Sequence, residues 1–230
     1  MGLPNGVHHL AICTKDMKAQ IEFFTQVLGM ELVALYWMHG VKNTYHGFVR
    51  MNDSSSIAFV QGPESGEIQP QEGVSHASWT AGLVAPGAMQ HLALNVDTEE
   101  ELLSMRDRLR SHGHWVMGPL DHGFCKSIYF AGPEGLMLEF STSEGGAIDQ
   151  EAWIDPEVVG LNGIDQEELE RYKHPQPFAS RGGTIQNPAV DPDNPPMRFP
   201  PGQDAVYRMS DEDVTAKLSE TTPPVQPKTD

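Results

Sequence analysis

Two short stretches of this sequence repeat one another, and each begins a similar succession of apolar patterns. The stretches are VHHLAICT, residues 7–14, and MQHLALNV, residues 89–96, which share the tripeptide His-Leu-Ala. In both, successive side chains alternate in character with a period of two, which is typical of a β-strand with two different faces. His9 and His91 occupy the same position of the repeat. The repeat therefore predicts two similar modules, each with a histidine on the corresponding strand face.

Each repeated strand is followed by the same order of elements. Residues 16–28 and 98–111 carry apolar side chains at helical spacing, and a glycine follows each as a stop signal. Three strand patterns come after each helix. They cover residues 31–38, 44–51 and 56–61 in the first module and residues 114–117, 127–131 and 136–142 in the second. Two βαβββ modules predict an α+β fold in which a curled eight-stranded mixed sheet surrounds a central cup.

The composition changes after the second module. Residues 145–230 hold most of the 18 prolines and are rich in acidic side chains, as is typical of chain without a core of its own. Aromatic residues nevertheless recur along this segment, and short helices are expected at residues 165–173 and 210–219. We expect residues 1–144 to form the paired-module domain, with modules at about 5–62 and 87–143. Residues 145–230 should form an extended C-terminal arm that docks on this domain or on a second subunit.

The whole chain is strongly acidic, with 15 basic against 32 acidic residues and a formal net charge of −17. This charge disfavours nucleic acids and anionic membrane surfaces as partners, and no apolar run is long enough to cross a membrane. The two cysteines, Cys13 and Cys125, both lie within strand patterns or beside them. We expect them to be reduced thiols in a cytoplasmic protein that has no secretory signal.

Three residues on inward strand faces form a candidate metal site. His9 and His91 open the two modules, and Glu139 alternates with the apolar Leu138 and Phe140 in the last strand pattern. A carboxylate in such a strand is costly to bury unless it is paired or bound to a metal. Two histidines and one carboxylate commonly hold iron in enzymes that activate O₂, because this set leaves open coordination positions. We predict that these three side chains converge on one metal ion.

The two modules and these residues resemble the vicinal oxygen chelate superfamily, which includes glyoxalase I, bleomycin-resistance proteins and extradiol ring-cleavage dioxygenases. The resemblance covers about residues 5–143. It implies metal ligands on the first strand of each module and on the last strand of the second, where His9, His91 and Glu139 stand. Within the superfamily, the segment DHGFCKSIYFAGPEGLMLE, residues 121–139, is most similar to the signature of one-domain extradiol dioxygenases.

The resemblance implies an Fe(II)-dependent dioxygenase that opens a catechol-type aromatic ring with O₂, with Mn(II) or another divalent ion as the alternative metal. Tyr129 would hydrogen-bond the substrate. His122 would donate a proton, because a side chain that titrates near neutral pH suits acid–base catalysis. A small aromatic diol and O₂ are the expected reactants, and a homo-oligomer, dimeric or larger, is the expected assembly.

Two other functions stay open at the level of sequence. A glyoxalase-type isomerase or lyase would normally use a fourth protein ligand, a carboxylate at the end of the first module, and residues 56–60 contain none. A non-catalytic ligand-binding protein of the resistance type would need no metal. Larger extradiol enzymes also carry a further acid–base histidine. The aligned positions here are Ser54–Ser56, so His46 or His76 would have to take that role.

Overall fold

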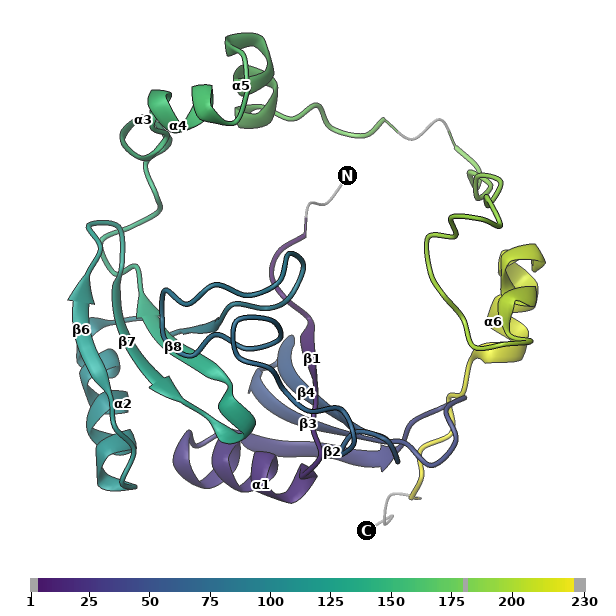
Figure 1. The fold of residues 1–230 in the computed structure, drawn as a ribbon, viewed down its shortest axis with the longest axis horizontal. Coiled ribbons are helices and arrows are strands. Elements are labelled where there is room, and N and C mark those ends of the chain that lie inside the picture. Colours follow the sequence, from purple (N-terminus) through teal and green to yellow (C-terminus); the bar gives the residue numbers. More distant parts are fainter. Residues whose placement is uncertain (1–3, 180–181, 226–230) are drawn as a thin grey trace. The chain divides into compact units, whose positions relative to one another are not determined.

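In a computed structural model, which describes residues 4–179 and 182–225, the first module forms one four-stranded sheet (Figure 1). Its strands lie in the order β1-β4-β3-β2, and the first strand pairs parallel with the last. A π-helical turn, η1, continues helix α1. The elements are β1 (His9–Cys13), α1 (Met17–Glu22), η1 (Phe23–Val27), β2 (Glu31–Trp37), β3 (Tyr45–Asn52) and β4 (Ser55–Gln61).

The second module repeats this plan in a second four-stranded sheet, in the order β5-β8-β7-β6 with β5 parallel to β8. The two βαβββ modules and the α+β class are thus confirmed. Among the described residues, however, the eight strands form two four-stranded sheets and no closed barrel. Strands β1 and β5 are edge strands, each paired with the last strand of its own module. The elements are β5 (Leu92–Asn95), α2 (Glu99–Ser111), β6 (Met117–Asp121), β7 (Lys126–Ala131), the 3₁₀ turn η2 (Pro133–Gly135) and β8 (Met137–Thr142).

Helix α2 begins with a capping box. The Thr98 side chain accepts a hydrogen bond from the Glu101 backbone N–H, and the Glu101 side chain accepts one from the Thr98 backbone N–H. Three glutamates in that turn also interact favourably with the positive N-terminal end of the helix dipole. The strand expected at residues 114–117 is displaced and runs from Met117 to Asp121. Val116, in the connection before this strand, is buried in the core. The apolar pattern at residues 114–117 therefore comes from core packing of the connection and not from the strand itself.

A single apolar core joins the helices and sheets of both modules. Phe24 contacts Phe59 within the first module with ring centres 5.0 Å apart, and Phe23 reaches Phe130 of the second module at 6.5 Å. Leu102 and Leu109 of α2 are fully buried. The opposite strand faces are more open: residues 9, 11 and 13 of β1 are exposed, whereas the alternating residues 10 and 12 are half-buried and pack against the core. The histidine-bearing faces therefore lie outside the core.

The side chain of Glu134, in turn η2, links the two modules. Its carboxylate accepts hydrogen bonds from the Thr14 hydroxyl at 2.6 Å, the Lys15 backbone N–H at 2.9 Å and the Gln20 amide at 2.8 Å. Glu134 also has a positive φ of 56°, which is unusual for a residue other than glycine. Burial alone would raise the pKa of Glu134, but these hydrogen bonds outweigh it and hold the pKa below the ordinary value of 4.5.

Replacement of Glu134 by glutamine should destabilise the protein by about 1–2 kcal/mol at pH 7, because a charged acceptor is lost from a partly exposed network. A depressed folded-state pKa contributes stability that is present above the unfolded-state pKa and is lost as pH falls through the folded-state pKa. The parent should therefore lose stability below about pH 4.5, and the variant should lose less. Urea unfolding at several pH values measures this difference. Equal acid sensitivity of both proteins would contradict it, and Glu67→Gln on the surface is the control.

Residues 145–175, the start of the C-terminal segment, fall in the same compact unit as the modules. This part contains three short helices. The Trp153 ring lies 4.8 Å from that of Phe124 in the β6–β7 loop, so Trp153 contacts the second module, as expected of a docking aromatic residue. The helices are α3 (Gln150–Trp153), α4 (Pro156–Leu161) and α5 (Gln166–Lys173).

Residues 176–225 fall in a second unit, which also includes residues 39–42. It contains the 3₁₀ turn η3 (Asp204–Arg208) and helix α6 (Asp211–Leu218). Phe199 and Tyr207 contact each other with ring centres 5.2 Å apart, so these two aromatic residues pack within the arm. Among the described residues, no helix is both long enough and apolar enough to cross a membrane.

Candidate metal centre

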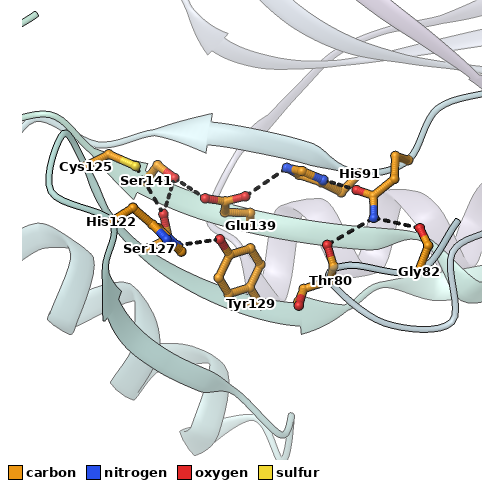
Figure 2. A network of polar contacts seen from close by, with 10 residues as sticks. Thr80, Gly82, His91, His122, Cys125, Ser127, Tyr129, Glu139 and Ser141 are labelled. Atoms are coloured by element: carbon orange, nitrogen blue, oxygen red, sulfur yellow. Dashed lines mark hydrogen bonds and ion pairs between the residues drawn. The ribbon is translucent and has the colours of Figure 1, made fainter. Parts of the chain in front are cut away.

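An imidazole and a carboxylate meet on the open face of the second sheet (Figure 2). His91 Nε2 lies 3.0 Å from Glu139 Oε2. The Glu139 side chain is buried, at 4% exposure for the residue, whereas His91 remains accessible. The strand ladder explains the arrangement, because Glu139 on β8 lies between Ala93 on β5 and Tyr129 on β7. Two of the three predicted metal ligands, His91 and Glu139, therefore contact each other.

Hydrogen bonds of Gln90 determine which nitrogen of His91 carries a proton. The Gln90 side-chain nitrogen donates to the backbone carbonyls of Thr80 at 3.0 Å and Gly82 at 2.9 Å. Its side-chain oxygen then faces His91 Nδ1. Since this amide oxygen can only accept, Nδ1 must be the donor. In a neutral ring, Nε2 is then a bare lone pair directed at the carboxylate of Glu139.

A chain of hydroxyl groups holds the other oxygen of Glu139. Ser141 donates to Glu139 Oε1, and its hydroxyl lies 2.7 Å from that of Ser127. The Cys125 sulfur is 3.7 Å from the Ser127 hydroxyl. Cys13 and Cys125 are both free thiols. The chain fixes the orientation of the carboxylate, because one oxygen is occupied by a donor and the other is left for His91.

His122 and Tyr129, the two predicted catalytic residues, contact each other beside this carboxylate. His122 Nε2 lies 2.9 Å from the Tyr129 hydroxyl, and the ring of Tyr129 is 6.5 Å from that of His91. Burial, and next the charge of Glu139, raise the pKa of Tyr129 above its ordinary value. The phenol therefore keeps its proton at neutral pH and can act as a hydrogen-bond donor.

His9 does not join this group. It lies on the open face of the first sheet, where its Nδ1 is 2.9 Å from that of His8 and its ring contacts Phe48 at 5.6 Å. Within the described ranges, no three or more His, Cys, Asp or Glu residues are placed to hold a metal ion. The structure of one chain thus brings together His91 and Glu139, but the predicted convergence with His9 is not seen in it.

The strand registers show how the two open faces have diverged. Glu139 faces Ala93 across β5–β8, and the corresponding partner of Ala11 in the first module is Ala58. In the second module, Tyr129 lies opposite Glu139. At the equivalent place in the first module, Phe48 lies opposite Ala58. The first module therefore offers no carboxylate and no phenol at these positions, which disfavours the fourth ligand of a glyoxalase.

The two histidines considered for a second acid–base role are in different environments. His46 is buried beside Phe48, with ring centres 4.5 Å apart, and its Nε2 has no hydrogen-bond partner among the described residues. Burial, together with the nearby His9, lowers its pKa. His76 is accessible and its Nδ1 is 2.8 Å from the Ser75 hydroxyl. Neither lies in the hydrogen-bonded network of Glu139.

Sequence reasoning missed three residues of this site. Ser127 and Ser141 lie two positions from Tyr129 and Glu139, so strand alternation alone would have placed them on the same face. Gln90 gave no such signal, because its role depends on carbonyl groups of the loop between the modules.

Solved structures that are similar to this chain include the following three. An integron cassette protein, HFX_CASS4, from the mobile metagenome of Halifax Harbour Sewage Outfall is 21% identical, with 60% of this chain and 99% of that chain covered and a TM-score of 0.45. A glyoxylase/bleomycin resistance protein/dioxygenase domain from Frankia sp. EAN1pec is 14% identical, with 61% and 99% covered and a TM-score of 0.47. TnmS3, an antibiotic-binding protein from Streptomyces sp. CB03234, is 16% identical, with 62% and 99% covered and a TM-score of 0.44.

These values support no statement about ligand or activity. No protein of curated function matches the chain. The sequence profile of one family, described as the Glyoxalase/Bleomycin resistance protein/Dioxygenase superfamily, matches residues 6–140, which include both modules. The chain therefore belongs to the Glyoxalase/Bleomycin resistance protein/Dioxygenase superfamily.

Proposed function

We propose that this protein is an Fe(II)-dependent extradiol dioxygenase that opens a catechol-type ring with O₂ and works as a homo-oligomer. The observation that carries the proposal is the pairing of His91 with Glu139 next to the hydrogen-bonded His122 and Tyr129. The first pair offers metal ligands and the second offers a proton donor and a phenol. Both pairs belong to the second module.

The chemistry of the first pair fits a divalent cation. The imidazole Nε2 of His91 and a carboxylate oxygen of Glu139 lie 3.0 Å apart, and both atoms can offer a lone pair to a cation. Gln90 holds the far nitrogen of His91, as neighbours of metal-bound histidines generally do. When bound, Fe(II) would supply the redox and Lewis-acid chemistry of the reaction.

We propose that the third ligand, His9, comes from a second copy of the chain. His9 lies on an exposed face of an edge strand, so it is accessible to a partner molecule. A three-ligand site would then form only in the oligomer. The same contact would bring Phe48 and other apolar residues of the first module towards the substrate, because Phe48 packs directly against His9.

The remaining residues would bind the substrate and transfer protons. Tyr129, which keeps its proton because its pKa is raised, would donate a hydrogen bond to a substrate oxygen. His122 would then lie one hydrogen bond away, in position to donate a proton as the ring opens. Glu139 would be held in place by the hydrogen bond from Ser141.

One observation favours a second candidate, a non-catalytic ligand-binding protein. Within the described part of a single chain, no group of three or more potential ligands is placed to hold a metal. If the chain worked as a monomer, the His91–Glu139 pair would be a structural ion pair, and the open faces would serve only to bind an apolar ligand.

Anaerobic purification with added Fe(II), followed by metal analysis and an oxygen electrode, tests the proposal. We expect about one iron per complete site, O₂ uptake with at least one catechol and formation of a yellow ring-opened product. His9→Ala should reduce bound iron while leaving the melting temperature unchanged, because His9 lies outside the core. Iron-loaded protein that consumes no O₂ with simple, biphenyl-type or bicyclic catechols would contradict the dioxygenase, and absence of metal binding would favour the second candidate.

A further inference from the structure

The loop between the two modules reaches the candidate metal centre through one side chain. Gln90 precedes His91 directly, and both hydrogens of its amide nitrogen are used by backbone carbonyls of that loop, Thr80 and Gly82. The amide oxygen is thereby turned towards His91 Nδ1. A reversed amide would place its oxygen against two carbonyl oxygens, so this orientation is the one the loop permits.

We propose that Gln90 is a positioning residue that keeps the proton of His91 on Nδ1, and that residues 79–82 of the inter-module loop hold Gln90 in place for this task. The inference rests on the proposed function, and it adds a means of control to the same site. If the loop moved, the amide would be free to turn, and Nε2 of His91 would no longer be reserved for a cation.

The chemistry behind this control is simple. A neutral imidazole has one bare nitrogen, and only that nitrogen can bind a metal. Without Gln90, the proton can move to Nε2, where it would be stabilised by Glu139 at 3.0 Å. The ring would then present its donor to the carboxylate, and the metal would have to displace a proton from a hydrogen bond.

Gly82 is packed closely against the backbone of this loop segment. The Gly82 backbone N–H donates to the carbonyl of Trp79 at 2.9 Å. A Cβ on Gly82 would lie 3.1 Å from that same carbonyl oxygen and 3.2 Å from the Ser78 backbone nitrogen. Gly82→Ala should therefore shift the carbonyl acceptors without touching Gln90 or His91.

The test compares Gln90→Leu with Gln69→Leu in the full-length protein. Gln69 is a matched control because it lies in the same loop and its amide also donates to a backbone carbonyl, that of Gly66 at 3.0 Å. The polar partners of His91 are Gln90 and Glu139 instead. In ¹⁵N-histidine-labelled, metal-free protein at neutral pH, the ¹⁵N signal of His91 should show a protonated Nδ1 in the parent and in Gln69→Leu. It should show a bare Nδ1 in Gln90→Leu.

Binding of Co(II), followed by its visible absorption, gives the second measurement. Gln90→Leu should weaken binding about 10–100-fold, as is typical when a partner of a metal-bound histidine is removed, and Gly82→Ala should weaken it less. A bare Nδ1 in the parent, or equal affinities of the parent and Gln90→Leu, would overturn the proposal, as would the same loss in Gln69→Leu. If Nδ1 responds as expected but no protein binds Co(II), the positioning role stands and the proposed metal function fails.

Discussion

Replacement of Glu139 by glutamine is expected to lower both the metal affinity and the O₂-dependent turnover by more than about 100-fold. A change next to a metal ligand commonly costs 10–100-fold in affinity, and here the ligand itself is changed. A neutral amide can still accept the hydrogen bond from Ser141, but it offers the metal no negative charge. The buried position of Glu139 makes this loss severe, because water does not readily replace the carboxylate.

The fold should survive this substitution, because glutamine has nearly the same shape and an amide is less costly to bury than a carboxylate. Isothermal titration with Co(II) and an oxygen electrode measure the loss, and circular dichroism checks the fold. Glu144→Gln is the control, because this exposed carboxylate accepts a backbone N–H from Glu99 at 2.7 Å, which an amide can also do. Metal affinity within about tenfold of the parent would show that Glu139 is not a ligand.

The fold was largely predictable because its signals are local. Strand alternation and helical spacing identified both βαβββ modules, and the observed strand faces place His9 and the residues that alternate with it away from the core, as expected. The association of strands into sheets was less predictable. β1 and β5 satisfy their backbone hydrogen bonds within their own modules, and nothing in the alternating pattern determines whether these edges also join.

The candidate site was predictable to the extent that its residues share one strand face. Tyr129 and Glu139 lie opposite each other in the β7–β8 ladder, and the loop residue His122 reaches Tyr129. The position of His9 was a different problem, because equal places in two repeats do not determine how the repeats are arranged in space. Gln90 was also beyond sequence reasoning, since its function depends on carbonyl groups some ten residues earlier in the chain.

The open faces of the two modules carry different side chains at equivalent places. The second module carries a carboxylate, a phenol and hydroxyl groups, whereas Ala58 and Phe48 occupy two of these places in the first. An aromatic diol has a polar edge and an apolar body. We therefore expect the second module to bind the two oxygens and the first, with Phe48 and His9, to supply the apolar wall and one ligand.

Replacement of His122 by alanine should reduce turnover about 10²–10⁴-fold with bound iron unchanged, because a positioned proton donor is removed without altering the ligands. Tyr129→Phe should also retain iron and reduce turnover, since it removes the hydroxyl alone. The two groups are 2.9 Å apart and would act as one unit. We therefore expect the double variant to be about as slow as the slower single variant, because the effects of residues in contact are not additive.

Single-turnover measurements on anaerobically loaded enzyme, started by mixing with O₂-saturated buffer, separate this effect from weaker substrate binding. Tyr172→Phe is the matched control, because it removes the same hydroxyl group from an exposed residue of α5. If the double variant showed the product of the two single losses, His122 and Tyr129 would act independently. If His122→Ala turned over as fast as the parent, the proton would come from another group, and the β6–β7 loop would have no part in catalysis.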